Sequence, residues 1–210
     1  MINIKENFAL IDEEIPNVIL DIRYYSDYNF VGKRIDGYED NCAIMSKEAI
    51  NALKKVSDEL LEHGYKLKIY DAYRPQTAVN HFINWCKNIK DIKMKKYFYP
   101  NIDKKDIISR KFISNHSSHS SGSTIDLTLY DIKLDKDVDM GSDFDLFDDI
   151  SYSHNNKITK YQQKNRDLLI NTMTKFGFIN YDREWWHFTL KNEPFKNIYF
   201  NFNVSRKIFK

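Results

Sequence analysis

The chain has 210 residues, 42% hydrophobic and 15% aromatic, enough for a sizeable core in one domain over residues 1–210. Its 32 basic and 30 acidic side chains nearly balance, which argues against a nucleic-acid partner. No apolar run approaches the ~18 residues of a membrane span, and the acidic N-terminus lacks a signal-peptide core. Cys42 and Cys86 form no C-x-x-C pattern and are expected to be buried free thiols. We therefore expect a cytoplasmic protein without a membrane partner.

The first predicted elements are a strand and a long helix. Residues 17–25 are apolar and β-branched at the start, which suits an early strand. In residues 46–63 the apolar side chains recur at helical spacing. Ser46 can serve as the N-cap, and Gly64 can adopt the left-handed conformation that ends a helix. This segment is the best-supported helix of the chain.

A second strand and a second helix follow directly. Residues 66–70 indicate a short strand, and Pro75 fits the first turn of a helix that reaches about residue 88. The lysine-rich residues 87–111 are interrupted by aspartates and indicate a solvated face rather than a binding patch. We expect residues 90–113 to be partly irregular.

The remaining elements complete the predicted fold class. Residues 124–130 alternate strictly between polar and apolar side chains, as a strand does. Residues 161–176 indicate a helix closed by Gly177, and residues 185–190 a last strand. Several short strands without βαβ regularity favour an α+β fold, with helices packed on a small, mostly antiparallel sheet.

A histidine and an aspartate can converge near the strand at residues 124–130. Asp126 lies in mid-strand opposite the leucines, where an acid by default points into solvent. His119 precedes it by seven residues, and Gly122 allows a tight turn that folds the histidine back. A catalytic zinc site uses three protein ligands and leaves a fourth position for water. The pair would supply two of these ligands.

Spacing alone leaves the third ligand open. His116 is a rival because it lies near His119. His187 stands in an aromatic segment, where a core histidine is the ordinary interpretation, but Glu184 precedes it by three residues. In a regular strand these two residues would lie on opposite faces, so they share a site only if Glu184 lies in a turn or bulge. Three other histidines are interpreted as structural or surface residues: His63, His81 and His154.

Two further side chains would complete a hydrolytic site. A carboxylate at Glu184 could take a proton from a water molecule whose pKa zinc lowers to about 7. Arg74 follows Asp71 in the sequence D-x-x-R-P, and the two could form a surface ion pair and nothing more. A guanidinium held near the metal would instead stabilise the oxyanion of a tetrahedral intermediate.

These segments together resemble one known family. The motif S-x-H-x-x-G-x-x-x-D at residues 117–126 occurs with D-A-Y-R-P-Q at 71–76 and E-W-W-H at 184–187. Further matching stretches follow in order over most of the chain, at residues 29–38, 127–131, 140–145 and 193–202. The combination resembles the VanX-type D-alanyl-D-alanine dipeptidases. These enzymes belong to a larger group of zinc D,D-peptidases. The resemblance implies a hedgehog/D,D-peptidase-like fold with the zinc site at the sheet.

The resemblance implies a role for each candidate residue. His119, Asp126 and His187 would bind one Zn²⁺ per chain, which selects His119 over its neighbour as the ligand. Glu184 would be the general base, and Arg74 would polarise the scissile carbonyl. Four residues would form the substrate-binding group: Asp145, which receives the free ammonium, Ser117, Tyr24, and Asp71, which orients the arginine.

One departure from the wider group is visible. Thr124 stands two residues before the ligand aspartate, where the group often has alanine. A β-branched residue suits a strand, so we expect little consequence.

The implied function is hydrolysis of D-alanyl-D-alanine, in glycopeptide (vancomycin) resistance or in recycling of peptidoglycan dipeptide. The partner would be this small dipeptide. A D,D-carboxypeptidase acting on peptidoglycan stem peptides is the nearest alternative. A non-catalytic zinc-binding module is a second alternative, disfavoured because Glu184 and Arg74 are both present. The oligomeric state is left open, with a homodimer as one option.

Overall fold

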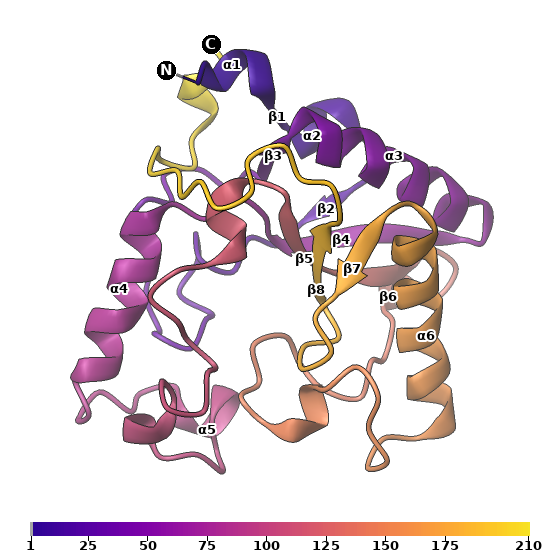
Figure 1. Ribbon diagram of the computed structural model, residues 1–210. Coiled ribbons are helices and arrows are strands. Elements are labelled where there is room, and N and C mark those ends of the chain that lie inside the picture. Colours follow the sequence, from indigo (N-terminus) through magenta and orange to yellow (C-terminus); the bar gives the residue numbers. More distant parts are fainter. Residues whose placement is uncertain (1) are drawn as a thin grey trace.

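The computed structural model describes residues 2–210 (Figure 1). The strands are β1 (Phe8–Leu10), β2 (Ile19–Leu20), β3 (Ile44–Ser46), β4 (Tyr65–Asp71), β5 (Thr124–Asp131), β6 (Lys136–Asp137), β7 (Phe178–Asn180) and β8 (His187–Leu190). The α-helices are α1 (Ile4–Asn7), α2 (Ile11–Glu14), α3 (Lys47–Glu62), α4 (Gln76–Lys87), α5 (Lys95–Phe98) and α6 (Lys160–Lys175). Short 3-10 helices are η1 (Lys104–Asp106), η2 (Ser118–Ser121), η3 (Asp149–Ser151) and η4 (Arg206–Ile208).

The main sheet has the strand order β2-β4-β5-β8-β7, with β6 paired to the far end of β5. Within it only β2 and β4 run parallel, and β1 and β3 form a separate antiparallel pair. Helix α3 contacts β4, and α6 contacts β7 and α3. The predicted α+β fold with a mostly antiparallel sheet is confirmed.

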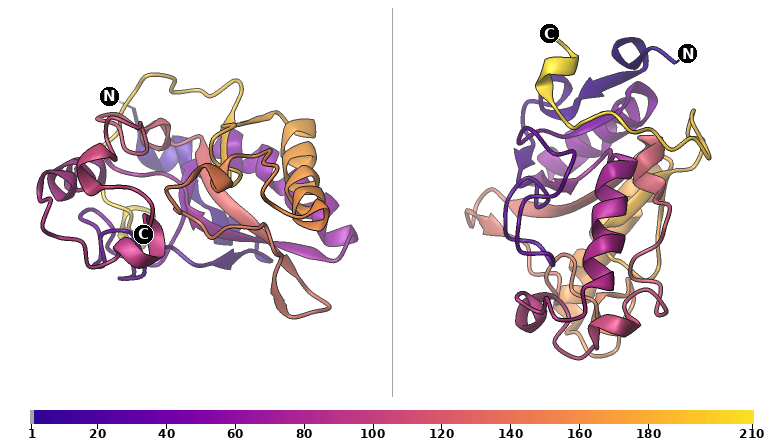
Figure 2. Two further views of the ribbon diagram at one scale, coloured as in Figure 1. Left: turned by 90° about the horizontal axis from the view of Figure 1, so that it is seen from below. Right: turned by 90° about the vertical axis from the view of Figure 1, so that its left-hand side faces the viewer.

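Helix α4 and the irregular segment that follows it lie on one side of the central strands, and helix α6 lies on the other. Helix α4 and helix α6 lie on opposite sides of β5 and β8 in Figure 1. Seen from below in Figure 2, the segment around α5 and η1 lies on one side and α6 on the other. The segment that follows β6 contacts the segment that contains α5, where the Phe147 amide donates to the Phe98 carbonyl at 2.7 Å.

The long helices begin and end where local side chains cap them. In α3 the Ser46 Oγ accepts a hydrogen bond from the Ala49 amide at 3.4 Å, and Gly64 ends the helix with φ 85°. Helix α6 starts at residue 160 because Thr159 and Gln162 form a capping box. These two helices match their prediction to within one residue at each end.

Three predicted elements differ from the structure at their boundaries. Pro75 is the N-cap of α4, with an extended backbone, and does not belong to the first helical turn. The strand predicted over 17–25 is only the two-residue β2. The strand predicted over 185–190 begins at His187, because the two residues before it form a turn. Strands of two or three residues give too little alternation to be recognised, so β1, β3, β6 and β7 were not predicted.

The polar side of β5 is buried, although its alternation suggested a half-exposed strand. The first six residues of β5 are all buried, including Asp126 at 2% exposure. The strands β4 and β8 pair with its two edges, and the burial of successive residues shows that both of its faces are covered as well. One face enters the apolar core, and the other encloses polar side chains that must find partners or a ligand.

The segment between α4 and η2 is partly irregular, as predicted. Most of its lysines are exposed, but Lys104 is buried with its Nζ 3.7 Å from the centroid of the Trp85 ring. The Lys104 Nζ also donates to the Asp91 carbonyl oxygen at 2.6 Å. One lysine of this stretch is therefore structural.

Cys42 and Cys86 are buried free thiols, which confirms their predicted state. Among residues 2–210, none of the helices has the length and apolar character required to cross a bilayer.

Candidate active site

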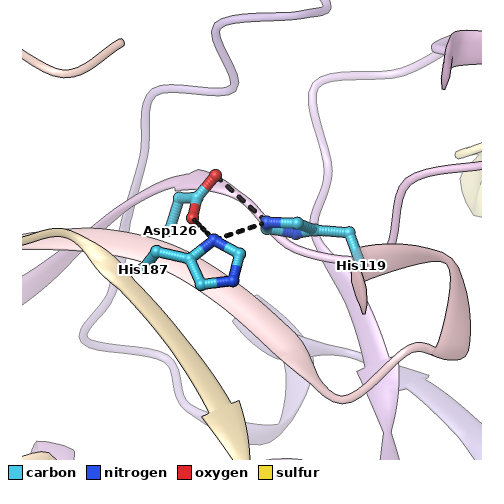
Figure 3. Close-up of side chains that lie close together, drawn as sticks. All are labelled: His119, Asp126 and His187. Carbon is cyan, nitrogen blue, oxygen red and sulfur yellow. Dashed lines mark hydrogen bonds and ion pairs between the residues drawn. The ribbon is translucent and has the colours of Figure 1, made fainter. Parts of the chain in front are cut away.

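Three side chains converge at the centre of the main sheet (Figure 3). Asp126 on β5 pairs directly with His187 at the start of β8, and His119 approaches from η2. The Nδ1 atom of His187 lies 3.0 Å from Asp126 Oδ1 and 3.2 Å from His119 Nε2. His119 Nε2 lies 3.3 Å from Asp126 Oδ2. Antiparallel pairing places opposite side chains about 5 Å apart, which explains how residues distant in sequence meet.

A tight turn brings His119 to this point, as the sequence predicted. Ser117 caps η2 by accepting a hydrogen bond from the His119 amide at 3.3 Å. Gly122 then reverses the chain with φ 85°. A Cβ built at Gly122 would lie 2.2 Å from Cε1 of Phe8, so the turn is closely packed as well as left-handed. Only glycine fits there.

The second ring nitrogen of His119 has a fixed partner. Its Nδ1 lies 2.7 Å from the Ala72 carbonyl oxygen, which can only accept a hydrogen bond. The proton therefore sits on Nδ1, and the lone pair of Nε2 faces Asp126 and His187. A carbonyl that holds the far side of a histidine in this way is typical of metal ligands.

The donor set fits a divalent metal ion. The ligand atoms of His119, Asp126 and His187 all lie within 4.8 Å of one another. Asp126 Oδ1 is buried and accepts no hydrogen bond from any described residue. Burial alone would raise the pKa of Asp126, but His119 and His187 outweigh it and hold that pKa below its ordinary value. Two imidazoles and one carboxylate suit Zn²⁺ with a position left for water.

Glu184 lies beside this group, in a turn before β8. A turn at this point is what the sequence required for Glu184 and His187 to share a site. The Glu184 amide donates to the Tyr181 carbonyl at 2.9 Å, and the His187 amide donates to the Glu184 carbonyl at 3.2 Å. Asn180 Nδ2 donates to both carbonyls, of Glu184 at 3.1 Å and of His187 at 3.0 Å. Glu184 Oε2 lies 3.5 Å from His187 Nδ1, and burial raises the pKa of Glu184. The carboxylate is therefore next to the ligand atoms without belonging to the set.

Arg74 is held by two carboxylates. Its Nε donates to Asp71 Oδ2 at 2.9 Å, and its Nη2 donates to Asp126 Oδ2 at 3.4 Å. Tyr38 donates to the other oxygen of Asp71 at 2.6 Å, and the Arg74 guanidinium lies 4.9 Å from the Tyr24 ring centroid. Arg74 lines the cavity described below, whereas the buried Asp71 is not among the lining residues. Asp71 thus contacts the arginine from behind and does not face the cavity.

A cavity of about 260 Å³ opens onto the three converging side chains. Asp145 and Tyr24 form part of its wall, and the Tyr24 hydroxyl donates to Asp145 Oδ2 at 2.8 Å. Asp145 has φ 61°, in the left-handed region, and its pKa is raised well above the ordinary value by burial and by Asp126. Ser117 also lines the cavity. The structure thus brings all the predicted residues except Asp71 to one cavity wall.

Other residues of this cavity were not predicted as site residues. Aromatic side chains from separate segments form much of the wall: Phe30, Phe82, Phe112, Phe147 and Tyr181. Lys111 and His116 also line it. His116 stacks on Tyr199 with centroids 4.5 Å apart and lies outside the converging group.

Thr124 does not crowd the ligand group. Its Oγ1 lies 2.8 Å from Oγ1 of Thr189 on β8, and the residue is not among those that line the cavity. The cross-strand hydrogen bond satisfies a buried hydroxyl.

A His–Asp–His group with His119 and Asp126 buried and His187 partly exposed lies beside a carboxylate and a guanidinium at a small cavity. This arrangement defines a candidate centre for metal-dependent hydrolysis. Comparison with known proteins agrees. The profile described as D-ala-D-ala dipeptidase matches residues 5–205. The chain is 40% identical to a D-alanyl-D-alanine dipeptidase of Enterococcus faecium, over 94% of this chain and 98% of that protein.

Two further relatives carry the same name. The D-alanyl-D-alanine dipeptidase of Enterococcus faecalis is 39% identical over 96% of this chain and 100% of its own length. That of Streptomyces coelicolor is 36% identical over 95% of this chain and 98% of its own. The chain belongs to the D-ala-D-ala dipeptidase family of metallopeptidases, peptidase M15. The resemblance found in the motifs is thereby confirmed.

Proposed function

We propose that this protein is a zinc-dependent dipeptidase that hydrolyses D-alanyl-D-alanine to two molecules of D-alanine. The observation that carries the proposal is the convergence of His119, Asp126 and His187 in one cavity with Glu184 and Arg74. The three relatives named above, each covered almost completely, support the choice of substrate.

His119, Asp126 and His187 would hold the Zn²⁺ ion. When bound, the ion supplies Lewis acidity that lowers the pKa of a water molecule and polarises a carbonyl oxygen. Two features of the chain suit this ion. The Ala72 carbonyl fixes the tautomer of His119, and one oxygen of Asp126 accepts no hydrogen bond from the described residues.

Glu184 is proposed as the general base. Its carboxylate is near the ligand atoms, 3.5 Å from His187 Nδ1, and it lines the cavity where a dipeptide would bind. Burial raises the pKa of Glu184, which makes the carboxylate a better proton acceptor than an exposed glutamate. Glu184 takes a proton from the attacking water and returns it to the leaving amine.

Arg74 is proposed to stabilise the oxyanion that forms from the scissile carbonyl. The ion pair with Asp71 fixes the guanidinium, and Tyr38 fixes the carboxylate in turn. Because these contacts exist before substrate binds, the arginine needs little rearrangement during the reaction.

Asp145 is proposed to bind the free ammonium of the dipeptide. It is buried in the cavity wall, and a buried carboxylate strongly favours a cationic partner over a neutral amide. A stem peptide has an amide at this position and would leave Asp145 unpaired. This difference favours the dipeptidase over the D,D-carboxypeptidase alternative.

Kinetics with two substrates test the proposal. The zinc-loaded protein should cleave D-alanyl-D-alanine much faster than an N-acetylated tripeptide that ends in D-alanyl-D-alanine. Glu184→Gln should keep its zinc and lose about 10²–10⁴-fold in kcat. Faster cleavage of the blocked tripeptide would favour the carboxypeptidase, and an inactive wild type with full zinc would revive the binding-module alternative.

The cellular role is a separate part of the proposal. We propose that the enzyme works in the cytoplasm, either in glycopeptide resistance or in dipeptide recycling. Expression of the wild type and of Glu184→Gln in a glycopeptide-sensitive host would test the role in resistance. Cell fractionation would test the cytoplasmic location. Light scattering on the purified protein would test the homodimer.

A further inference from the structure

Residues 139–152, the Asp145 segment, have little regular structure of their own. Residues 139–148 form neither helix nor strand, and the short helix η3 follows them. Near the middle of the segment, Asp145 has φ 61° and is only 7% exposed. Turning outwards would relieve both the backbone strain and the burial of its carboxyl group. Contacts from outside the segment therefore have to keep Asp145 in the cavity wall.

A buried arginine on α6 bridges the two ends of this segment. Arg166 Nε donates to the Met140 carbonyl oxygen at 2.6 Å, and its Nη1 donates to the Tyr152 carbonyl oxygen at 2.5 Å. Positions 140 and 152 are 12 residues apart, and Asp145 lies between them. One guanidinium thus closes a loop around Asp145, and closure restricts the conformations that the middle of a loop can adopt.

The third nitrogen of Arg166 joins the Asp145 segment to the turn that carries Glu184. Its Nη2 donates to Ser142 Oγ at 3.4 Å, and the same oxygen accepts a hydrogen bond from Trp185 Nε1 at 2.9 Å. Trp185 directly follows Glu184, and its amide donates to the Ser151 carbonyl oxygen at 3.0 Å. A displacement of the segment would therefore reach the proposed base as well as Asp145.

Arg166 is a buried cation without a carboxylate partner. The residue is 0% exposed and forms no ion pair with any residue among 2–210. Burial lowers the pKa of Arg166 to about 10, so the guanidinium still carries its charge at neutral pH. Apolar side chains of similar volume can replace buried ions without loss of stability. Core stability alone therefore does not explain an arginine here, whereas its three hydrogen bonds to the segment do.

Neighbouring side chains of α6 hold only the beginning of the segment. Gln162 Nε2 donates to Asp139 Oδ2 at 2.9 Å, and Asn165 Nδ2 donates to the Asp139 carbonyl oxygen at 2.8 Å. Arg166 adds the far end, because its planar guanidinium presents donors at three nitrogens in a fixed geometry. A lysine has a single nitrogen at its end and cannot make the same bridge.

We propose that Arg166 is a positioning residue that holds the Asp145 segment so that the carboxylate of Asp145 faces the substrate ammonium. The inference rests on the proposed dipeptidase activity and on the proposed role of Asp145. Arg166 is not among the residues that line the cavity, so it acts through Asp145 and does not contact the substrate. The Tyr24 hydroxyl holds the carboxyl group directly, and Arg166 holds the backbone on either side.

Kinetics of the zinc-loaded enzyme test this role through the preference for a free amine. The preference is the ratio of kcat/KM for D-alanyl-D-alanine to kcat/KM for the N-acetylated dipeptide. Arg166→Met removes the charge and the donors but keeps an unbranched side chain, and we expect the preference to fall about tenfold. A shift of the turn that carries Glu184 would affect both substrates alike and cancels in this ratio.

Leu169→Ala is the matched control for a general loss of stability. Leu169 is a buried apolar residue of the same helix, so its truncation should lower the Tm and leave the preference unchanged. An equal fall of the preference in Leu169→Ala and Arg166→Met would overturn the proposal. An unchanged preference in a folded Arg166→Met protein would overturn it as well.

A double-mutant cycle shows whether Arg166 acts through Asp145. Once Asp145→Asn is present, Arg166→Met should lower the preference little further, because the group that it positions is already lost. Another tenfold fall in the double variant would mean that the two residues act independently, which contradicts the proposal.

Hydrogen exchange separates a failure of this inference from a failure of the proposed function. A wild type that does not cleave D-alanyl-D-alanine would refute the proposed function, whereas amide exchange over residues 139–152 reports on the segment itself. Relative to the rest of the chain, this exchange should be about tenfold faster in Arg166→Met and unchanged in Leu169→Ala. Equal protection in wild type and Arg166→Met would refute the inference.

Arg166→Lys keeps the inference testable if Arg166→Met does not fold. It retains the positive charge but not the bridge between the Met140 and Tyr152 carbonyls. We expect faster exchange of residues 139–152 and a reduced preference for the free amine. Wild-type values for both in Arg166→Lys would show that the charge alone suffices and would refute the bridge.

Discussion

The Nδ1 atom of His119 and the carbonyl oxygen of Ala72 lie 2.7 Å apart, directly after the end of strand β4. Because the carbonyl can only accept, the proton is fixed on Nδ1 and the Nε2 lone pair points to the other two ligand residues. The backbone just after β4 therefore selects the tautomer of a histidine that belongs to a different segment.

His119→Gln should abolish metal binding, whereas His116→Gln should not. The first change removes one of three converging donors, and the second removes an imidazole that stacks on Tyr199 outside the group. We expect zinc affinity to fall by more than about 100-fold for His119→Gln. Mutation of residues that only hydrogen-bond to a metal ligand already lowers metal affinity by about 10–100-fold. Competition with a chromophoric chelator measures it. Loss of zinc in His116→Gln alone would contradict the assignment.

Removal of the metal should lower the thermal stability as well as the activity. A ligand that binds only the folded state stabilises it by about 2.7 kcal/mol at 100 times its Kd. For a chain of this length that corresponds to a Tm difference of about 5–10 °C. Thermal melts with excess Zn²⁺ and with a chelator measure the difference. Equal Tm values in both conditions would show that the three residues do not bind zinc in the folded protein.

Asp145→Asn should reduce the preference for a free amine. The buried carboxylate that would bind the ammonium becomes neutral, while the Tyr24 hydroxyl keeps a partner. We expect KM for D-alanyl-D-alanine to rise about 10- to 100-fold, with little change for the N-acetylated dipeptide. Asp143→Asn, an exposed neighbour that does not line the cavity, is the matched control. An identical loss in both variants would argue against a specific ammonium site.

Gly122→Ala should destabilise the protein more than Gly64→Ala. Both glycines have φ 85°, so the backbone strain of about 1 kcal/mol is shared. At Gly122 the new methyl would also overlap Phe8, whereas no described atom lies within 4 Å of a Cβ at Gly64. We expect the free energy of unfolding to fall by about 3 kcal/mol for Gly122→Ala and by about 1 kcal/mol for Gly64→Ala, as measured by urea unfolding. Equal losses would mean that Phe8 moves aside without cost.

The two cysteines should resist alkylation in the folded protein. Burial raises the pKa of the Cys42 thiol to about 12 and that of Cys86 to about 11. Only the thiolate reacts, and at pH 8 roughly a thousandth of Cys86 would be ionised. Iodoacetamide should therefore modify both residues slowly until denaturant is added, as intact mass spectrometry can follow. Rapid modification of native protein at pH 8 would contradict this expectation.

Local signals explain which elements could be predicted from the sequence. Helices α3 and α6 carry their own caps, Ser46 and Thr159, so their ends depend on residues only a few positions away. By contrast, the burial of the polar face of β5 depends on side chains from distant segments, such as Arg74 and His187, which no short window of sequence around β5 contains. The default expectation of an exposed Asp126 was wrong for this reason.

The residues of the candidate site also divide into those that local sequence predicts and those that depend on contacts between distant segments. His119 and Asp126 are close in sequence, and Gly122 between them made their convergence predictable. His187 became identifiable only through the family motif, because its contact with Asp126 is a long-range strand pairing.

The ring of Phe8 packs against Gly122 and also stacks on Phe195, with centroids 5.5 Å apart. Phe200 and Phe202 contact the same ring, so segments near the two ends of the chain meet behind the turn that carries His119 (Figure 1). Positions 8 and 195 are 187 residues apart, and such long-range contacts generally form late in folding. Metal uptake should therefore be among the last steps of maturation, and a chain still emerging from the ribosome would not yet hold the ion.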